Sequence, residues 1–172
     1  MSVAHGIETF RDPLTDCIAA FLRGIGLSVR AGTVAGPTAL PGIDIVHGTL
    51  IVDARTMRYP GDLLHEAGHL AVVPAARRAA FHHDVGNDAG EEMAAIAWSY
   101  AAAVHLGVHP AIVFHDGGYR RGSSSILSSF AGKQPIGVPL LGWLGMTAPD
   151  SPGDTPPFPH MTSWLCRRED FT

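Results

Sequence analysis

The five residues His65-Glu66-Ala67-Gly68-His69 have the types and spacing of a zinc-hydrolase motif. On an α-helix, positions i and i+4 lie on one face about a turn apart, so the two imidazoles can bind the same Zn²⁺. Glu66 is rotated beside them and can reach a water on that metal. Apolar residues flank the motif, as expected for a helix buried in a small domain: Leu63, Leu64, Leu70, Ala71 and Val72. The pattern predicts a zinc site with Glu66 as general base.

A catalytic zinc site needs a third protein ligand besides the two histidines. The candidates are Glu91, Glu92, His115 and the loop residues His82, His83 and Asp84. Asp88 and Glu91 have the spacing of a helix N-cap and its third residue, which gives Glu91 a capping role. Glu92 is then free to face the metal. We therefore predict that His65, His69 and Glu92 hold the zinc, with Glu91 and then the loop group as alternatives.

A β-hairpin is expected before the motif, with strands at residues 43–46 and 49–52 and a two-residue turn at His47-Gly48. In this register one face of the hairpin is apolar. That face consists of Ile43, Ile45, Leu50 and Val52. The motif helix is the natural cover for it.

Two helices are expected to carry the metal ligands. The motif helix starts at residues 59–62, where Pro60 and Asp62 suit a first turn, and ends at Pro74. After a loop, a second helix opens near Asp88 and runs to about His105; it is apolar nearly all round and should be buried.

The remaining elements are read from shorter patterns. Residues 10–23 predict a helix with Cys17 on its buried side, and residues 27–34 a strand with Val29, Ala31 and Thr33 on one face. Three short helices are expected, at residues 110–115, 123–130 and 138–144. Residues 147–159 are rich in proline and polar residues and predict an extended surface tail.

The order of hairpin, HExxH helix and glutamate-bearing helix resembles the ImmA/IrrE-type branch of the gluzincin metallopeptidases. Glu92, Ala95 and Trp98 match that family's pattern Glu-x-x-Ala-Asn-x-Phe-Ala, whereas Ile96 and Ser99 depart from it. The similarity covers about residues 26–104. It implies an α+β, zincin-like fold: a short twisted sheet with a β-hairpin packed on the HExxH helix, a second Glu-bearing helix, a helical C-terminal part and a Pro-rich tail. It also implies zinc-dependent hydrolysis of a peptide bond.

Length and composition bound the organisation and the partners. A chain of 172 residues suits one domain, which we place at residues 1–146, followed by a Pro-rich tail at 147–172 that packs on it or extends from it. The net charge of −4 gives no electrostatic reason for a nucleic-acid partner. No apolar run suits a membrane span, and no signal segment opens the chain. We expect a cytoplasmic protein whose partner is a peptide or protein substrate.

Catalysis also needs a substrate-binding edge and an oxyanion donor. The outer edge of the strand at residues 49–54 could pair with an extended peptide. His115, Tyr119 and Arg120, in a polar glycine-rich loop, are the candidate donors. Asp62 and Asp88 are candidates for orienting a ligand histidine.

An alternative to the peptidase is a catalytically silent or latent zinc-binding module of the same fold, acting in regulation or interaction. The Pro-rich tail favours it, because the tail could lie over the cleft and His160 could fill the open metal position. A metal-free helical protein with structural histidines is the third hypothesis.

Overall fold

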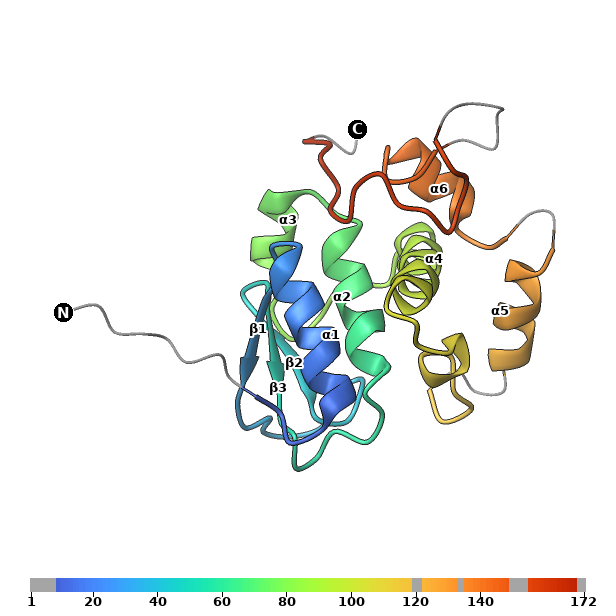
Figure 1. Ribbon diagram of the computed structural model, residues 1–172. Helices are drawn as coiled ribbons and strands as arrows, with labels where there is room; N and C mark the ends of the chain where they lie inside the picture. The colour runs from blue at the N-terminus through green and yellow to red at the C-terminus, as the bar shows by residue number, and fades with distance from the viewer. Residues whose placement is uncertain (1–8, 119–121, 133–134, 149–154, 170–172) are drawn as a thin grey trace.

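A three-stranded sheet forms one layer of the molecule (Figure 1). The structure is a computed structural model, and it describes residues 9–118, 122–132, 135–148 and 155–169. The strands of the sheet are β1 (Ser28–Ala31), β2 (Ile43–Val46) and β3 (Thr49–Val52), in the order β1-β3-β2. β3 runs parallel to β1 and antiparallel to β2. The described part of the chain is thus of mixed α and β structure, as expected.

The hairpin is confirmed in its strands, turn and register. Ile43 pairs with Val52, and Ile45 pairs with Leu50. His47 and Gly48 both have positive φ, at 48° and 72°, which is the backbone of a type I′ turn. The four predicted apolar side chains are buried, and they join one hydrophobic core with apolar side chains of the helices that follow.

The prediction that a peptide pairs with the outer edge of the strand at residues 49–54 is wrong. β3 lies in the centre of the sheet and pairs on both sides, so it has no free edge for a peptide. The edge strands are β1 and β2, and part of the outer edge of β2 is already used. The Ile43 amide donates to the Leu40 carbonyl at 3.2 Å, and the His83 amide donates to the Ile45 carbonyl at 2.7 Å. The hairpin pattern alone could not show that β1 would occupy the other side of β3.

The first helix and strand are shorter than predicted. Helix α1 (Pro13–Gly24) begins three residues after Phe10, because Asp12 is extended and its carboxylate caps the helix by accepting from the Thr15 amide. Cys17 is exposed on α1, not buried. In β1 only Val29 is buried; Ala31 is exposed, and Thr33 is exposed and lies beyond the end of the strand.

Helices α2 (Asp62–Ala71) and α4 (Ala89–His105) lie side by side, and α1 lies over the sheet next to α2 (Figure 1). α2 ends at Ala71, before Pro74, and the Arg78 guanidinium donates to the carbonyl of Leu70 in its last turn and to that of Val73 just beyond it. A short helix absent from the predictions, α3 (Ala75–Ala80), follows, with Pro74 as its N-cap.

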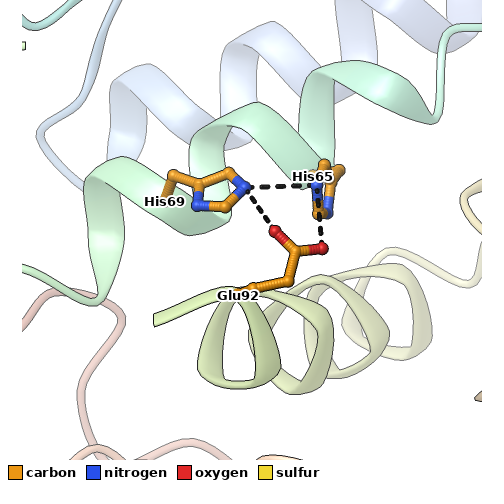
Figure 2. Close-up of side chains that lie close together, drawn as sticks. All are labelled: His65, His69 and Glu92. Carbon is orange, nitrogen blue, oxygen red and sulfur yellow. Dashed lines mark hydrogen bonds and ion pairs between the residues drawn. The ribbon is translucent and has the colours of Figure 1, made fainter. Parts of the chain in front are cut away.

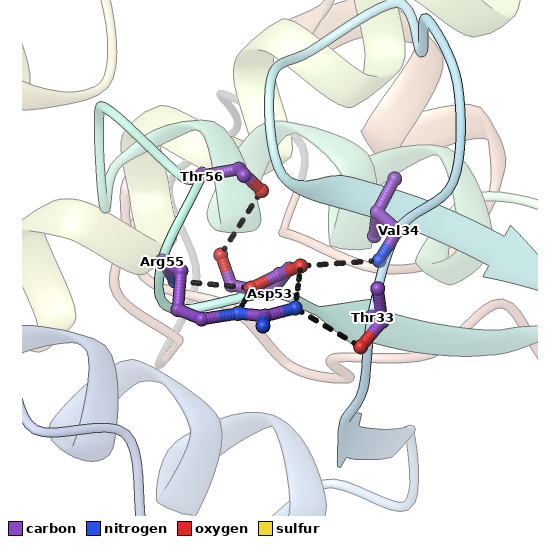
Figure 3. Close-up of polar contacts among 5 residues, drawn as sticks. All are labelled: Thr33, Val34, Asp53, Arg55 and Thr56. Carbon is purple, nitrogen blue, oxygen red and sulfur yellow. Dashed lines mark hydrogen bonds and ion pairs between the residues drawn. The ribbon is translucent and has the colours of Figure 1, made fainter.

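A carboxylate fixes the connection between β3 and α2 (Figure 3). Asp53 is buried at the end of β3 and accepts hydrogen bonds from the Val34 amide, the Arg55 amide and the Arg55 guanidinium. These contacts tie the loop that leads to α2 to the loop that follows β1. They lower the pKa of Asp53 to about 2, chiefly through the hydrogen bond from the Arg55 side chain.

The C-terminal part contains a 3-10 helix, η1 (Pro110–Ile112), then α5 (Ser123–Phe130) and α6 (Val138–Trp143). The helix expected at residues 110–115 is therefore reduced to one turn. Parts of the tail pack inward: Met161 and Cys166 are buried, and the Cys166 amide donates to the Ala71 carbonyl at 2.8 Å. None of the helices among the described residues is long and apolar enough to cross a membrane.

Candidate metal site

The side chains of His65, His69 and Glu92 converge on one point between α2 and α4 (Figure 2). The Nε2 atoms of the two histidines are 3.2 Å apart. The Glu92 oxygens lie 3.2 Å from His69 Nε2 and 3.7 Å from His65 Nε2. Ligand atoms around a tetrahedral zinc ion at ordinary bond lengths are about 3.3 Å apart. The donor set and its spacing therefore fit a zinc ion.

Close packing of α2 against α4 brings the glutamate to the histidines. A Cβ atom on Gly68 would lie 2.8 Å from the Ala95 carbonyl oxygen and 3.1 Å from the Ser99 hydroxyl. Since such an approach is too short for a real Cβ, only glycine allows this helix spacing. The buried Ser99 hydroxyl lies within hydrogen-bond distance of the carbonyl oxygens of Leu64 and Ala95, at 3.2 and 2.6 Å, and so contacts both helices.

The start of α4 gives its two adjacent glutamates different partners. The Asp88 carboxylate accepts from the Glu91 amide at 2.8 Å, as predicted for the N-cap. The Glu91 side chain does not return to Asp88; it forms a two-point ion pair with the Arg77 guanidinium of α3. The reciprocal capping box is thus incomplete. The next residue, Glu92, faces α2.

The surroundings of His65 and Glu92 favour the protonation states that bind a metal. The side chains of His65 and His69 are 12% and 9% exposed, whereas that of Glu92 is 45% exposed. Burial, and next the neighbouring His69, lower the pKa of His65 well below its usual value. The hydrogen bond to His69 lowers the pKa of the Glu92 carboxyl. Neutral imidazole and ionised carboxylate are the forms that bind a metal.

A cavity of about 260 Å³ opens over these residues and is lined in part by Asp62, Glu66 and Gly118. Glu66 therefore faces the same space as the three candidate ligands. The pKa of Glu66 is raised to about 6, chiefly by burial; His69 lowers it and the nearby carboxylates raise it by smaller amounts. A carboxyl with this pKa can both take up and release a proton near neutral pH.

His115 lies beside the site and contacts Asp62 rather than the ligands. Its Nε2 is 2.7 Å from Asp62 Oδ1, its ring stacks on Tyr59, and its Nδ1 is buried with no hydrogen-bond partner among the described residues. One nitrogen is thus engaged and the other enclosed, so neither is presented to a substrate. Gly61 permits this arrangement, because a Cβ there would collide with the Ile112 carbonyl just before His115. Burial raises the pKa of Asp62.

The other candidate residues lie elsewhere. His83 is 2.8 Å from Asp44, His82 is exposed and stacks on His47, and neither joins the metal-binding group. Asp84 is exposed near Glu66 in a neighbouring cavity. Tyr119 and Arg120, the other candidate oxyanion donors, lie outside the described residues.

The tail residue His160 does not line the cavity over the candidate ligands. Its side chain is exposed, and its carbonyl accepts from the Thr147 hydroxyl at 2.7 Å. Sequence reasoning missed Asp44, which sits one residue from each buried isoleucine of β2 and faces the neighbouring cavity with Glu66. Its only sequence signal is a carboxylate inside an otherwise apolar strand.

Comparison of the chain with models of known protein families, with curated proteins and with solved structures gave no match in any of the three. The geometry of His65, His69, Glu92 and Glu66 is therefore the basis for assigning a function.

Proposed function

We propose that this protein is a zinc-dependent metallopeptidase with a zincin-like fold. The observation that carries the proposal is the convergence of His65, His69 and Glu92 at tetrahedral spacing, with Glu66 facing the same cavity. A zinc ion held by these residues would act as a Lewis acid and lower the pKa of its water. The half-exposed Glu92 leaves one side of the site open to solvent and substrate.

In this reading each residue of the chain has a separate task. Glu66 takes the proton of the attacking water and passes it to the leaving amine. Asp62 lies at the cavity wall, and His115 is a positioning residue that holds it there. The contact of His115 with Asp62 supports this positioning task, and a direct oxyanion contact by His115 stays a prediction.

The test is the variant Glu66→Gln, assayed with a randomised fluorogenic peptide library after loading with zinc. We expect it to keep one equivalent of zinc and to lose about a thousandfold in kcat/KM, because the base is removed and the ligands remain. Glu169→Gln, at an exposed carboxylate outside the cavity, is the matched control and should keep full activity. Unchanged hydrolysis in Glu66→Gln would remove Glu66 as the base.

The same assay separates the peptidase from the silent zinc-binding module. A parent protein that retains zinc but hydrolyses no peptide favours the silent module. The position of His160 outside the cavity gives no support to occlusion of the site by this residue.

A further inference from the structure

A second cavity adjoins the first and shares Glu66 with it. It has a volume of about 150 Å³, and the two cavities also share Ala39, Leu40, Val85 and Gly86 in their walls. A peptide whose scissile bond lies beside Glu66 can therefore place a neighbouring part of its chain at the mouth of the second cavity. Under the proposed function, the second cavity is in the right place for a side-chain subsite.

The second cavity combines apolar walls with carboxylates. Leu40, Ile43 and Val85 line it, together with the carboxylates of Asp44 and Asp84. No lysine or arginine is among its described lining residues. An apolar stem that ends in a positive charge is the side chain that such walls complement, since lysine and arginine bury their methylene groups and keep the charged end among polar groups.

The local structure holds both carboxylates in place. Asp44 is 14% exposed; it accepts from the Ile45 amide at 2.8 Å and contacts the His83 imidazole at 2.8 Å. Asp84 is exposed and accepts from the Gly86 amide at 2.8 Å. A carboxylate has about four acceptor positions, so each group keeps capacity for a further donor. The acceptors are thus fixed before a ligand arrives, which reduces the entropy cost of binding.

We infer that the second cavity selects peptides with a lysine or arginine next to the bond that is cleaved, and that Asp44 and Asp84 are the specificity-determining residues. This inference rests on the proposed function for its biological meaning. It concerns a site that the metal-binding residues do not form, so the two can fail separately.

The experiment compares three peptides that differ only in a lysine, leucine or glutamate beside the cleavage position found in the library assay. For the zinc-loaded parent we expect kcat/KM for the lysine peptide to exceed that for the glutamate peptide by about tenfold or more. Asp84→Lys should reverse this order. Because Asp84 is exposed, the substitution leaves the packing of the core unchanged. Asp44→Asn should reduce the preference mainly through KM, and Glu169→Gln should leave it unchanged.

A binding measurement keeps the inference testable without turnover. The binding of labelled lysine and glutamate peptides to zinc-loaded Glu66→Gln is measured by fluorescence anisotropy. The peptides have the library-consensus sequence, or an otherwise random sequence if nothing is hydrolysed. We expect tighter binding of the lysine peptide, lost when Asp84→Lys is added. Equal binding of the two peptides, or equal hydrolysis by the parent, would overturn the subsite and leave the peptidase intact. Selective binding without any hydrolysis would instead contradict the peptidase and support the subsite.

Discussion

Two adjacent glutamates show how residue-scale environment decides chemistry. Glu91 and Glu92 have the same side chain, but a rotation of about 100° along α4 directs one to Arg77 and the other to the two histidines. The ion pair holds Glu91 on the side of α3, and Glu92 keeps an open carboxylate at the cavity. The assignment of the third ligand therefore depends on helix phase, not on residue type.

A second residue-scale contact is the pair formed by Asp62 and His115. We expect His115→Ala to lower the free energy of unfolding by about 2 kcal/mol, because it leaves the buried Asp62 carboxyl without its imidazole partner. Urea unfolding is measured for His115→Ala, for Asp62→Ala and for the double variant that carries both substitutions. The three free energies of unfolding, compared with that of the parent, give the coupling energy between the two side chains. A double variant as unstable as the sum of the two would contradict the pairing. His160→Ala, at an exposed imidazole, is the control.

At the scale of elements, the site depends on how closely α2 and α4 pack. Gly68→Ala should favour an isolated helix by about 1 kcal/mol, but here the added Cβ meets the Ala95 carbonyl. We expect a net loss of stability and weaker zinc binding, because the two helices must move apart. The matched control is Gly142→Ala in α6, where a Cβ meets nothing within 4 Å. A Gly68→Ala protein with parental zinc affinity and stability would contradict the packing argument.

The loop between β3 and α2 is the second element-scale device. The pKa of Asp53 in the folded protein, about 2, lies below its ordinary value of 3.8. The stability that its ionised form contributes is therefore complete above the ordinary pKa and is lost as pH falls through the folded pKa. Asp53→Asn should lower the urea midpoint at pH 7, and the gap to the parent should narrow as pH falls from about 5 toward about 2. A gap that stays constant over this range would show that Asp53 acts through shape alone; Glu169→Gln is the charge control.

At the scale of the whole molecule, the C-terminal segment belongs to the folded core. Trp164 packs edge-on against Phe21 of α1 and Trp98 of α4, and the Trp98 indole donates to the Trp164 carbonyl at 3.0 Å. These contacts lie among helices that also position the metal ligands. The tail thus stabilises the fold at a place that does not line the metal cavity.

We therefore expect Trp164→Ala to reduce the free energy of unfolding by about 2 to 3 kcal/mol, with the loss of stability reported by a single cooperative transition. Trp143→Ala is the matched control: its ring is 48% exposed beneath Arg168, and its removal should cost less than about 1 kcal/mol. Equal effects of the two substitutions would argue that the tail is not part of the core. Urea denaturation followed by circular dichroism measures both.

Sequence reasoning succeeded where the determining interactions are local. The hairpin follows from alternation and a two-residue turn, and the cap at Asp88 follows from one side chain and the backbone beside it. It failed where distant contacts decide. The position of β3 in the sheet depends on its pairing with β1, and the Leu70 carbonyl in the last turn of α2 is satisfied by Arg78 of the next helix. Asp44 became visible only when the fold placed β2 beside Glu66.

The central claim is tested most directly by the zinc content of the purified, untagged protein, measured by elemental analysis beside Glu92→Gln, His69→Ala and the neighbouring control Glu91→Gln. We expect one equivalent of zinc in the parent and in Glu91→Gln, and a loss of zinc in the other two variants. A parent that takes up no zinc after incubation with the metal, or a Glu92→Gln protein that binds it as well as the parent, would contradict the account.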